Sequence, residues 1–154
     1  MLSEKEKAEI QEELGHSQTR RAAVPEALKI VQRHRGWVSD AAIQDVAEFL
    51  EMTPDEVDAV ATFYSLVFRR RVGRHVILLC DSVSCYVTGY NVIRKRLNES
   101  LGIDLGQTTA DGKFTLLPAS CLGLCEQAPA MIVDQDTHGQ LTPEKVDEVL
   151  ARYT

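Results

Sequence analysis

The four cysteines of the chain stand in two tight pairs, and this spacing limits how the chain can fold. Cys80 and Cys85 form the first pair, and Cys121 and Cys125 form the second. Residues 86–120 separate the pairs, so only tertiary structure can bring all the thiols together. Two close pairs that converge in this way can surround one metal centre with thiolate ligands.

Composition narrows the classes of protein to which the chain can belong. With 154 residues, of which 44% are hydrophobic, the chain is large enough for one ordinary domain with a helical extension. Its net charge of −6 argues against binding to a nucleic-acid backbone, which requires a basic face. No apolar run is long enough for a membrane span, and the charged start of the chain does not resemble a secretory signal. We therefore expect a cytoplasmic protein, in which structural disulfides are rare.

The first part of the chain has helical periodicity. The pattern predicts a helix over residues 3–14, a second that begins near Pro25 and ends at Gly36, and a third that is capped by Ser39-Asp40. A capping box with proline at the first helical position, residues 53–56, opens a fourth helix. We expect a helical bundle over residues 1–72.

After the basic run of residues 69–74, the pattern changes to that of a small α/β sandwich over residues 73–154. A continuous apolar run predicts a buried strand that ends at Cys80. The remaining expected elements are a helix over 90–101, strands over 113–117 and 131–133, a turn over 136–139 after which Gln140-Leu141 pairs back, and a last helix opened by Thr142-Pro143.

Both cysteine pairs follow predicted strands, whose ends gather at one edge of an α/β sheet. Gly123 lies between the second pair and permits a loop whose N–H groups approach sulfur, whereas Asp81 and Glu126 would place negative charge beside it. From spacing alone three alternatives stay open: a [2Fe–2S] cluster, a structural zinc ion, and two disulfides. The zinc alternative corresponds to a protein-binding module without a redox role.

A longer pattern surrounds the second pair. Residues 111–129 read D-x2-F-T-x5-C-L-G-x-C-x2-A-P. This pattern resembles the signature of the 24 kDa subunit family of respiratory complex I, the NADH:quinone oxidoreductase. The similarity extends upstream through residues 26–32, 35–38, 61–65 and 72–76, and therefore spans nearly the whole chain.

The resemblance implies a thioredoxin-like ferredoxin domain behind a helical domain. It implies one [2Fe–2S] cluster whose ligands are Cys80, Cys85, Cys121 and Cys125. It also implies an electron-transfer subunit, without a complete active site of its own, that exchanges single electrons with FMN on a partner flavin subunit that binds NADH. The expected surroundings are the larger iron–sulfur subunit and the rest of the peripheral arm, on the cytoplasmic side of the inner membrane. Related subunits serve NAD-linked hydrogenases and formate dehydrogenases, so such a diaphorase is the alternative.

One aromatic pair has two interpretations in the sequence. Phe63-Tyr64 lies at the end of the fourth predicted helix. These side chains could anchor a partner protein, since aromatic residues are favoured at binding hot spots. Packing in the protein core is the alternative that we favour from the sequence.

Overall fold

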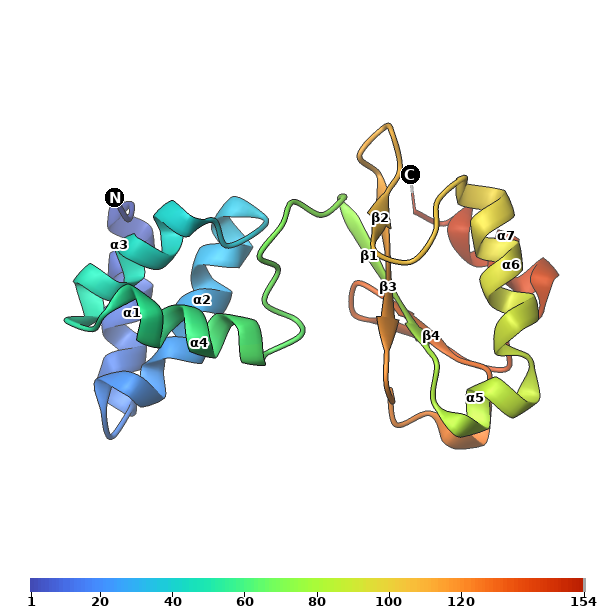
Figure 1. Cartoon of the computed structure of the whole chain (residues 1–154), viewed down its shortest axis with the longest axis horizontal. Helices are drawn as coiled ribbons and strands as arrows, with labels where there is room; N and C mark the ends of the chain where they lie inside the picture. Colours follow the sequence, from blue (N-terminus) through green and yellow to red (C-terminus); the bar gives the residue numbers. More distant parts are fainter. Residues whose placement is uncertain (154) are drawn as a thin grey trace. The chain divides into compact units, whose positions relative to one another are not determined.

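The computed structural model describes residues 1–153, which divide into two compact units between Arg71 and Val72 (Figure 1). The first unit contains only helices, and the second contains a mixed sheet with helices. The predicted fold class, a helical bundle followed by an α/β sandwich, is confirmed.

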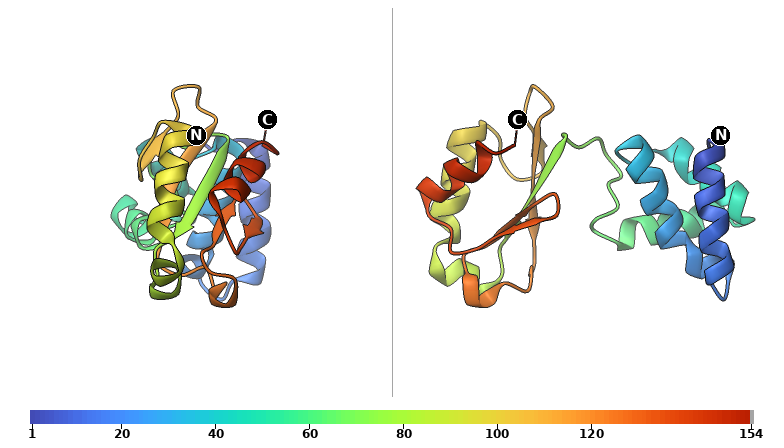
Figure 2. Two further views of the ribbon diagram at one scale, coloured as in Figure 1. Left: turned by 90° about the vertical axis from the view of Figure 1, so that its right-hand side faces the viewer. Right: turned by 180° about the vertical axis from the view of Figure 1, so that it is seen from behind.

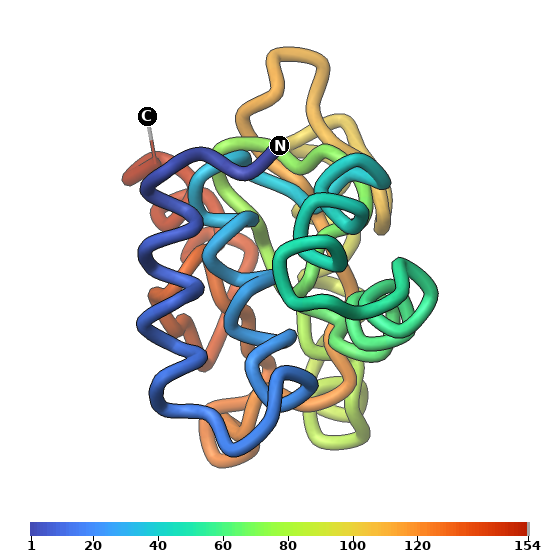
Figure 3. Tube along the Cα trace, turned by 90° about the vertical axis from the view of Figure 1, so that its left-hand side faces the viewer, coloured from blue at the N-terminus to red at the C-terminus, as the bar shows by residue number. Residues whose placement is uncertain are grey.

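The helical unit consists of four helices joined by short connections: α1 (Glu4–His16), α2 (Arg20–Arg35), α3 (Asp40–Leu50) and α4 (Pro54–Phe63). Helices α1 and α2 run side by side (Figure 3). The Thr53–Glu56 capping box at the start of α4 is formed as predicted, and the Ser39 side chain caps α3. Capping side chains satisfy N–H groups that the first helical turn leaves unpaired, so these short helices begin at defined residues.

A buried ion network ties three of these helices together. Glu6 of α1 is only 2% exposed, and its carboxylate accepts hydrogen bonds from the Arg35 guanidinium of α2 at 2.7 and 3.0 Å. The same guanidinium donates to Asp45 of α3 at 3.1 Å. The Arg35 hydrogen bond holds the pKa of Glu6 down at about 2, and Asp45 also has a lowered pKa. The network therefore needs ionised carboxylates.

The second unit is built on a five-stranded sheet in the order β2-β3-β1-β4-β5. Its elements are β1 (His75–Cys80), α5 (Val83–Thr88), α6 (Tyr90–Leu101), β2 (Gln107–Thr108), β3 (Phe114–Ala119), the short 3-10 helix η1 (Cys125–Gln127), β4 (Met131–Val133), β5 (Asp136–His138) and α7 (Pro143–Leu150). The central strands β1 and β3 are parallel, and the other pairings are antiparallel. Helix α6 has the predicted bounds.

One apolar core holds this unit together, and α6 and α7 lie on the same side of the sheet (Figures 1 and 2). Ile77 and Leu79 of β1 and Leu116 of β3 are fully buried. They pack in one cluster with Ile93 of α6 and Val146 of α7. Alternate residues of a strand share a face, so the apolar alternation of β1 directs one face of the sheet at these helices.

Three local predictions are wrong. Helix α2 begins at Arg20 behind the Thr19 cap, so Pro25 lies inside the helix rather than in its first turn. The expected turn at residues 136–139 is strand β5, which pairs with β4. Gln140-Leu141 do pair back as expected, since their amides donate to the carbonyls of Gln127 and Pro129 at 2.5 and 3.0 Å. The turn comes earlier, at Asp134, whose carboxylate accepts hydrogen bonds from His75 at 2.7 Å and from the backbone of Val76 at 2.9 Å.

The third wrong prediction concerns the aromatic pair at the end of α4. Phe63 is 79% exposed and Tyr64 is 45% exposed, with their rings in edge contact at 5.2 Å between centroids. The bundle core closes without them through smaller side chains such as Val57 and Ala61. Core packing is therefore not the role of these rings.

Candidate metal centre

The parallel pairing of β1 and β3 delivers the two cysteine segments to one edge of the sheet. Cys80 is the last residue of β1, and its register partner on β3 is Ala119. Cys121 follows the end of β3 by two residues. The amide of Asp81 donates to the Ala119 carbonyl at 3.0 Å, which continues the pairing past the strand end. The prediction that both pairs follow strands that end at one edge is confirmed.

The first cysteine pair is buried. Cys80 is 4% exposed, and Cys85 on the short helix α5 is 2% exposed. Burial raises the pKa of the Cys85 thiol to about 11, and the hydrogen bond with Cys80 contributes to this rise. A hydrogen bond from the backbone of Ala130 lowers the pKa of the Cys85 thiol and so opposes this rise. A metal bound here would therefore have to displace a firmly held proton, as metal binding to thiols requires.

The second pair lies in an exposed loop. Cys121 and Cys125 are both exposed, and Cys125 begins η1. Gly123 between them has a φ of +75°, a conformation that glycine adopts without steric cost. In this conformation its N–H group donates to the Cys121 sulfur at 3.4 Å. The loop is thus shaped so that a backbone amide points at a sulfur atom, as N–H···S bonds around an iron–sulfur cluster require.

Apolar side chains bring this loop against the buried pair. Leu122, Leu124 and Ala128 pack on the small cluster formed by Cys80, Cys85 and Ala130. The negative charge that Cys125 would carry as a thiolate also contributes to the raised pKa of Cys85. The segment that carries the first cysteine pair and the loop that carries the second therefore lie together at one edge of the sheet (Figures 1 and 2).

Four thiols match the ligand count of a [2Fe–2S] cluster and also that of a structural zinc ion. All four cysteines are free thiols. Within residues 1–153, no three histidine, cysteine or acidic side chains are gathered closely enough to hold one metal ion. A structural zinc ion takes four donors around one point, and a [2Fe–2S] cluster takes two thiolates on each iron.

Sequence reasoning missed Ala130 and the packing role of two leucines at this site. Ala130 is fully buried, and its carbonyl accepts the Cys80 amide at 3.2 Å. Leu122 and Leu124 flank Gly123, and these apolar side chains could have indicated that the loop packs against a buried cluster. Asp81 and Glu126, singled out for their charge, are both exposed. The Ala128–Pro129 peptide bond beside the loop is cis.

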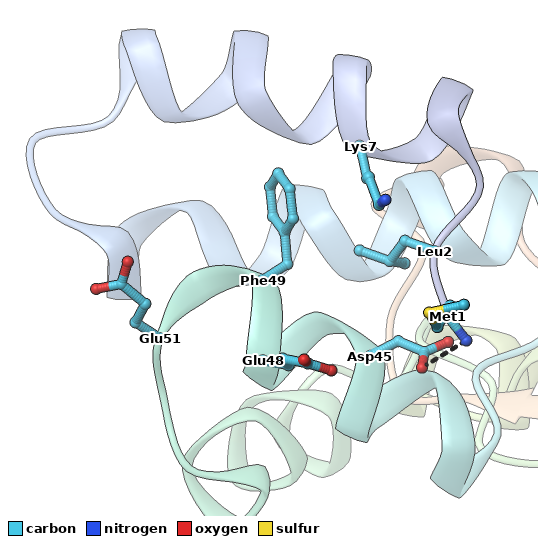
Figure 4. A pocket seen from close by; sticks show the side chains of 7 residues that line it. All are labelled: Met1, Leu2, Lys7, Asp45, Glu48, Phe49 and Glu51. Carbon is cyan, nitrogen blue, oxygen red and sulfur yellow. Dashed lines mark ion pairs between the residues drawn. The ribbon is translucent and has the colours of Figure 1, made fainter.

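A pocket elsewhere in the chain is unrelated to this chemistry. A cavity of about 330 Å³ in the helical unit is lined by Met1, Leu2, Lys7, Asp45, Glu48, Phe49 and Glu51 (Figure 4). The amino group of Met1 forms an ion pair with Asp45 at 2.9 Å on its wall. No cysteine lines this cavity, so it offers no thiolate ligand.

Of the helices within residues 1–153, none combines the length and the apolar character needed to cross a bilayer.

Comparison with known proteins agrees with this geometry. The sequence profile of the thioredoxin-like [2Fe–2S] ferredoxin family matches residues 10–154. Among curated proteins, the E subunit of the NADH-quinone oxidoreductase of Pseudomonas aeruginosa is 51% identical over 99% of this chain and 92% of its own length. The protein of the same name from Escherichia coli K12 is 53% identical, with the same coverage.

Among solved structures, an NAD+-reducing [NiFe]-hydrogenase in its H2-reduced state contains a similar region. The TM-score is 0.71 at 25% identity, over 82% of this chain. The chain spans only 22% of that hydrogenase chain, so the likeness covers one part of a larger protein.

Proposed function

The chain belongs to the thioredoxin-like [2Fe–2S] ferredoxin family, and from this premise we propose that it is the electron-transfer subunit of an NADH:quinone oxidoreductase. Relatives named as one subunit of this enzyme match 99% of the chain at 51% and 53% identity. Those names place the relatives within a multi-subunit oxidoreductase, so the chain contributes to an enzyme whose active site it does not complete.

We propose that Cys80, Cys85, Cys121 and Cys125 are the cluster ligands. The observation that carries this assignment is the packing of Leu122 and Leu124 against the buried pair, which holds the second cysteine loop at the first. A [2Fe–2S] cluster, when bound, accepts and returns one electron at a time. The protein itself supplies the thiolates, the Gly123 amide that is directed at the Cys121 sulfur, and the apolar surroundings.

The cluster-binding region is, in this proposal, a ferredoxin domain over residues 73–154 that follows a helical domain over residues 1–72. Two features support the division. Each of the two structural units has its own apolar cluster, and the unit boundary falls at Arg71–Val72. The four cysteines all belong to the second unit.

The partner in this proposal is the flavin subunit that binds FMN and NADH, joined by the larger iron–sulfur subunit and the rest of the peripheral arm. The names of the curated relatives support such an assembly. The chain would then lie at the cytoplasmic side of the inner membrane, held there by the other subunits.

The ligand assignment is tested by Cys121→Ser in the intact complex. We expect the electron paramagnetic resonance signal of the reduced cluster to be lost or shifted, because an oxygen in place of a thiolate ligand either fails to hold the cluster or changes its electronic structure. Ser120→Ala, at the neighbouring exposed position, is the matched control and should keep the signal. A signal in Cys121→Ser that is unchanged in both intensity and shape would contradict the assignment.

A second candidate is the diaphorase part of an NAD-linked hydrogenase, because the hydrogenase likeness covers 82% of the chain. Purification of the tagged chain from its native cells distinguishes the two. NADH:quinone activity without hydrogen uptake in the purified assembly supports the first candidate, and hydrogen-dependent NAD+ reduction supports the second.

A further inference from the structure

A short segment between β5 and α7, residues 139–141, lies against the end of the second cysteine loop and is here called the 139–141 strap. The amide of Gln140 donates to the Gln127 carbonyl at 2.5 Å. The amide of Leu141 donates to the Pro129 carbonyl at 3.0 Å. The strap therefore carries the antiparallel pairing of β4 and β5 beyond the sheet and into the cysteine loop.

Gly139 allows a close approach between the strap and the loop. A Cβ atom at this position would lie 2.5 Å from the Cβ atom of Gln127 and 2.8 Å from its carbonyl oxygen. Such contacts are too short for packed atoms, so any larger residue at position 139 must displace the backbone of Gln127. Gln127 is the last residue of η1, and Cys125 is the first. A displacement of Gln127 would therefore reach Cys125 through three residues of helix.

Gln140 has a backbone conformation that only its surroundings explain. Its φ is +50°, in the left-handed region that residues other than glycine rarely adopt. The residue is exposed, so packing of its side chain does not impose this conformation. Strained conformations persist where neighbouring contacts hold them, and the neighbouring contacts here are the two amide bonds to the cysteine loop.

The strap is itself anchored to the main body of the second unit. The Leu141 side chain is 5% exposed and belongs to the main apolar core. Lys145 in the first turn of α7 reaches back, and its ammonium group donates to the Gly139 carbonyl at 2.5 Å. The Thr142 side chain caps the same turn, since its hydroxyl accepts from the Lys145 amide at 3.2 Å. The strap thus connects the core and α7 to the cysteine loop.

The two cysteine pairs differ in what holds them in place. Cys80 and Cys85 are buried, whereas Cys121 and Cys125 are exposed. Core packing holds the first pair directly, while the second pair depends on contacts made by the residues around it. Residues behind metal ligands commonly fix the orientation of those ligands, and their loss weakens metal binding.

Resting on the function proposed above, we infer that the 139–141 strap positions the exposed half of the cluster site, with Gly139 and Lys145 as its positioning residues. Gly139 permits the close approach to Gln127, and Lys145 fixes the strap from the other side. Neither residue contacts a cysteine sulfur. Their effect on the cluster passes through Gln127 to Cys125.

The experiment compares Gly139→Ala with Gly15→Ala, each produced as the full chain with its cluster. Gly15 is the matched control, because a Cβ atom there would meet nothing within 4 Å. We expect Gly139→Ala to lose its cluster to an iron chelator about tenfold faster than the wild type, with a shifted electron paramagnetic resonance spectrum. Gly15→Ala should match the wild type in both. Circular dichroism establishes that each variant is folded.

A second variant, Lys145→Met, leaves the backbone contact intact and decides the matter if Gly139→Ala does not fold. Hydrogen exchange of the full chain with its cluster, followed by mass spectrometry, reports on the amides of Gln140 and Leu141. We expect these amides to exchange about tenfold faster in Lys145→Met, because a hydrogen bond from a charged donor contributes on this scale. The cluster should also be lost faster. Lys95→Met, at a side chain that is 78% exposed, is the control and should behave as the wild type.

The outcomes separate this inference from the proposed function. A folded Gly139→Ala that has lower thermal stability but an unchanged cluster spectrum and rate of cluster loss would show a purely structural role and overturn the inference. Unchanged exchange and cluster loss in Lys145→Met would also overturn it. Both results would leave the proposed function standing, whereas a wild-type chain that binds no iron would overturn the function itself.

Discussion

At the residue scale, two residues beside the cysteines affect the reduction potential of a cluster bound at this site. The Gly123 amide donates to the Cys121 sulfur, and such bonds favour the reduced, more negative cluster. Asp81 is exposed directly after the proposed ligand Cys80, and its negative charge disfavours the reduced cluster. The reduction potential of the site therefore reflects a local balance between an amide dipole and a carboxylate.

Asp81→Asn should raise the reduction potential of the cluster by on the order of tens of millivolts. Reduction adds an electron, and removal of a nearby negative charge stabilises the reduced form. A redox titration followed by the cluster signal measures this shift. Asp111→Asn, in the turn before β3 and therefore a full strand length from the cysteines, is the matched control. Equal potentials in Asp81→Asn and the wild type would show that solvent screens this carboxylate completely.

At the scale of elements, local signals explain some helices, whereas others depend on tertiary contacts. Helix α4 begins at Thr53-Pro54 with a complete capping box, which the four residues specify by themselves. Helix α5 has no side-chain cap and contains β-branched residues. Its six residues are too few for stability alone, so contact of Cys85 with the core must hold it.

Helices α1, α2 and α3 depend on the Glu6–Arg35 pair, and this makes the helical unit sensitive to acid. The pKa of Glu6 is lowered from 4.5 to about 2, so the folded state favours its ionised form. The resulting stabilisation is fully present above the unfolded value and is lost as pH falls from about 4.5 towards 2. Full loss corresponds to about 3 kcal/mol of unfolding free energy.

Glu6→Gln should therefore lower the unfolding free energy by about 2–3 kcal/mol at pH 7 and by much less near pH 2. Urea denaturation of the helical unit, followed by circular dichroism across this pH range, measures both effects. Glu12→Gln on the same helix replaces an exposed carboxylate and should change stability by about 0.5 kcal/mol or less. If Glu6→Gln lowers the free energy of unfolding equally at pH 7 and pH 2, the stabilisation does not come from the ionised Glu6 carboxylate.

At the scale of the whole molecule, each of the two units has its own hydrophobic core. The helical unit closes around aliphatic side chains such as Leu28, Val46 and Leu50. The second unit closes around the sheet and also keeps a small separate cluster of Cys80, Cys85 and Ala130. The proposed cluster site thus lies in a buried cluster separate from the main core of this unit.

Metal analysis of the purified chain distinguishes the two metal hypotheses. We expect a brown protein with about two irons per chain and absorption at roughly 420–460 nm, as thiolate-bound clusters show. A colourless protein with one zinc per chain would contradict the cluster and favour a structural site. Chelation of iron should remove the colour while the helical circular dichroism signal of α1 to α4 remains.

The sequence by itself determined what depends on neighbouring residues. It located the capping box at residues 53–56, both bounds of the helix over 90–101, and the strand that ends at Cys80. Caps, periodicity and residue type act over a few positions, so they can be read without the fold. The same local reasoning placed the start of α2 at Pro25 and missed the Thr19 cap that lies upstream of it.

Only the tertiary structure decided which parts of those patterns are buried and which are exposed. It buried Cys80 and Cys85 while leaving Cys121 and Cys125 in solvent, although all four are the same residue type. It places the last turn at Asp134, where residues at the start of β1 bond to the Asp134 carboxylate, and not at the predicted residues 136–139. It also leaves Phe63 exposed. Burial depends on which distant segments pack together, and that information is carried by no single stretch of sequence.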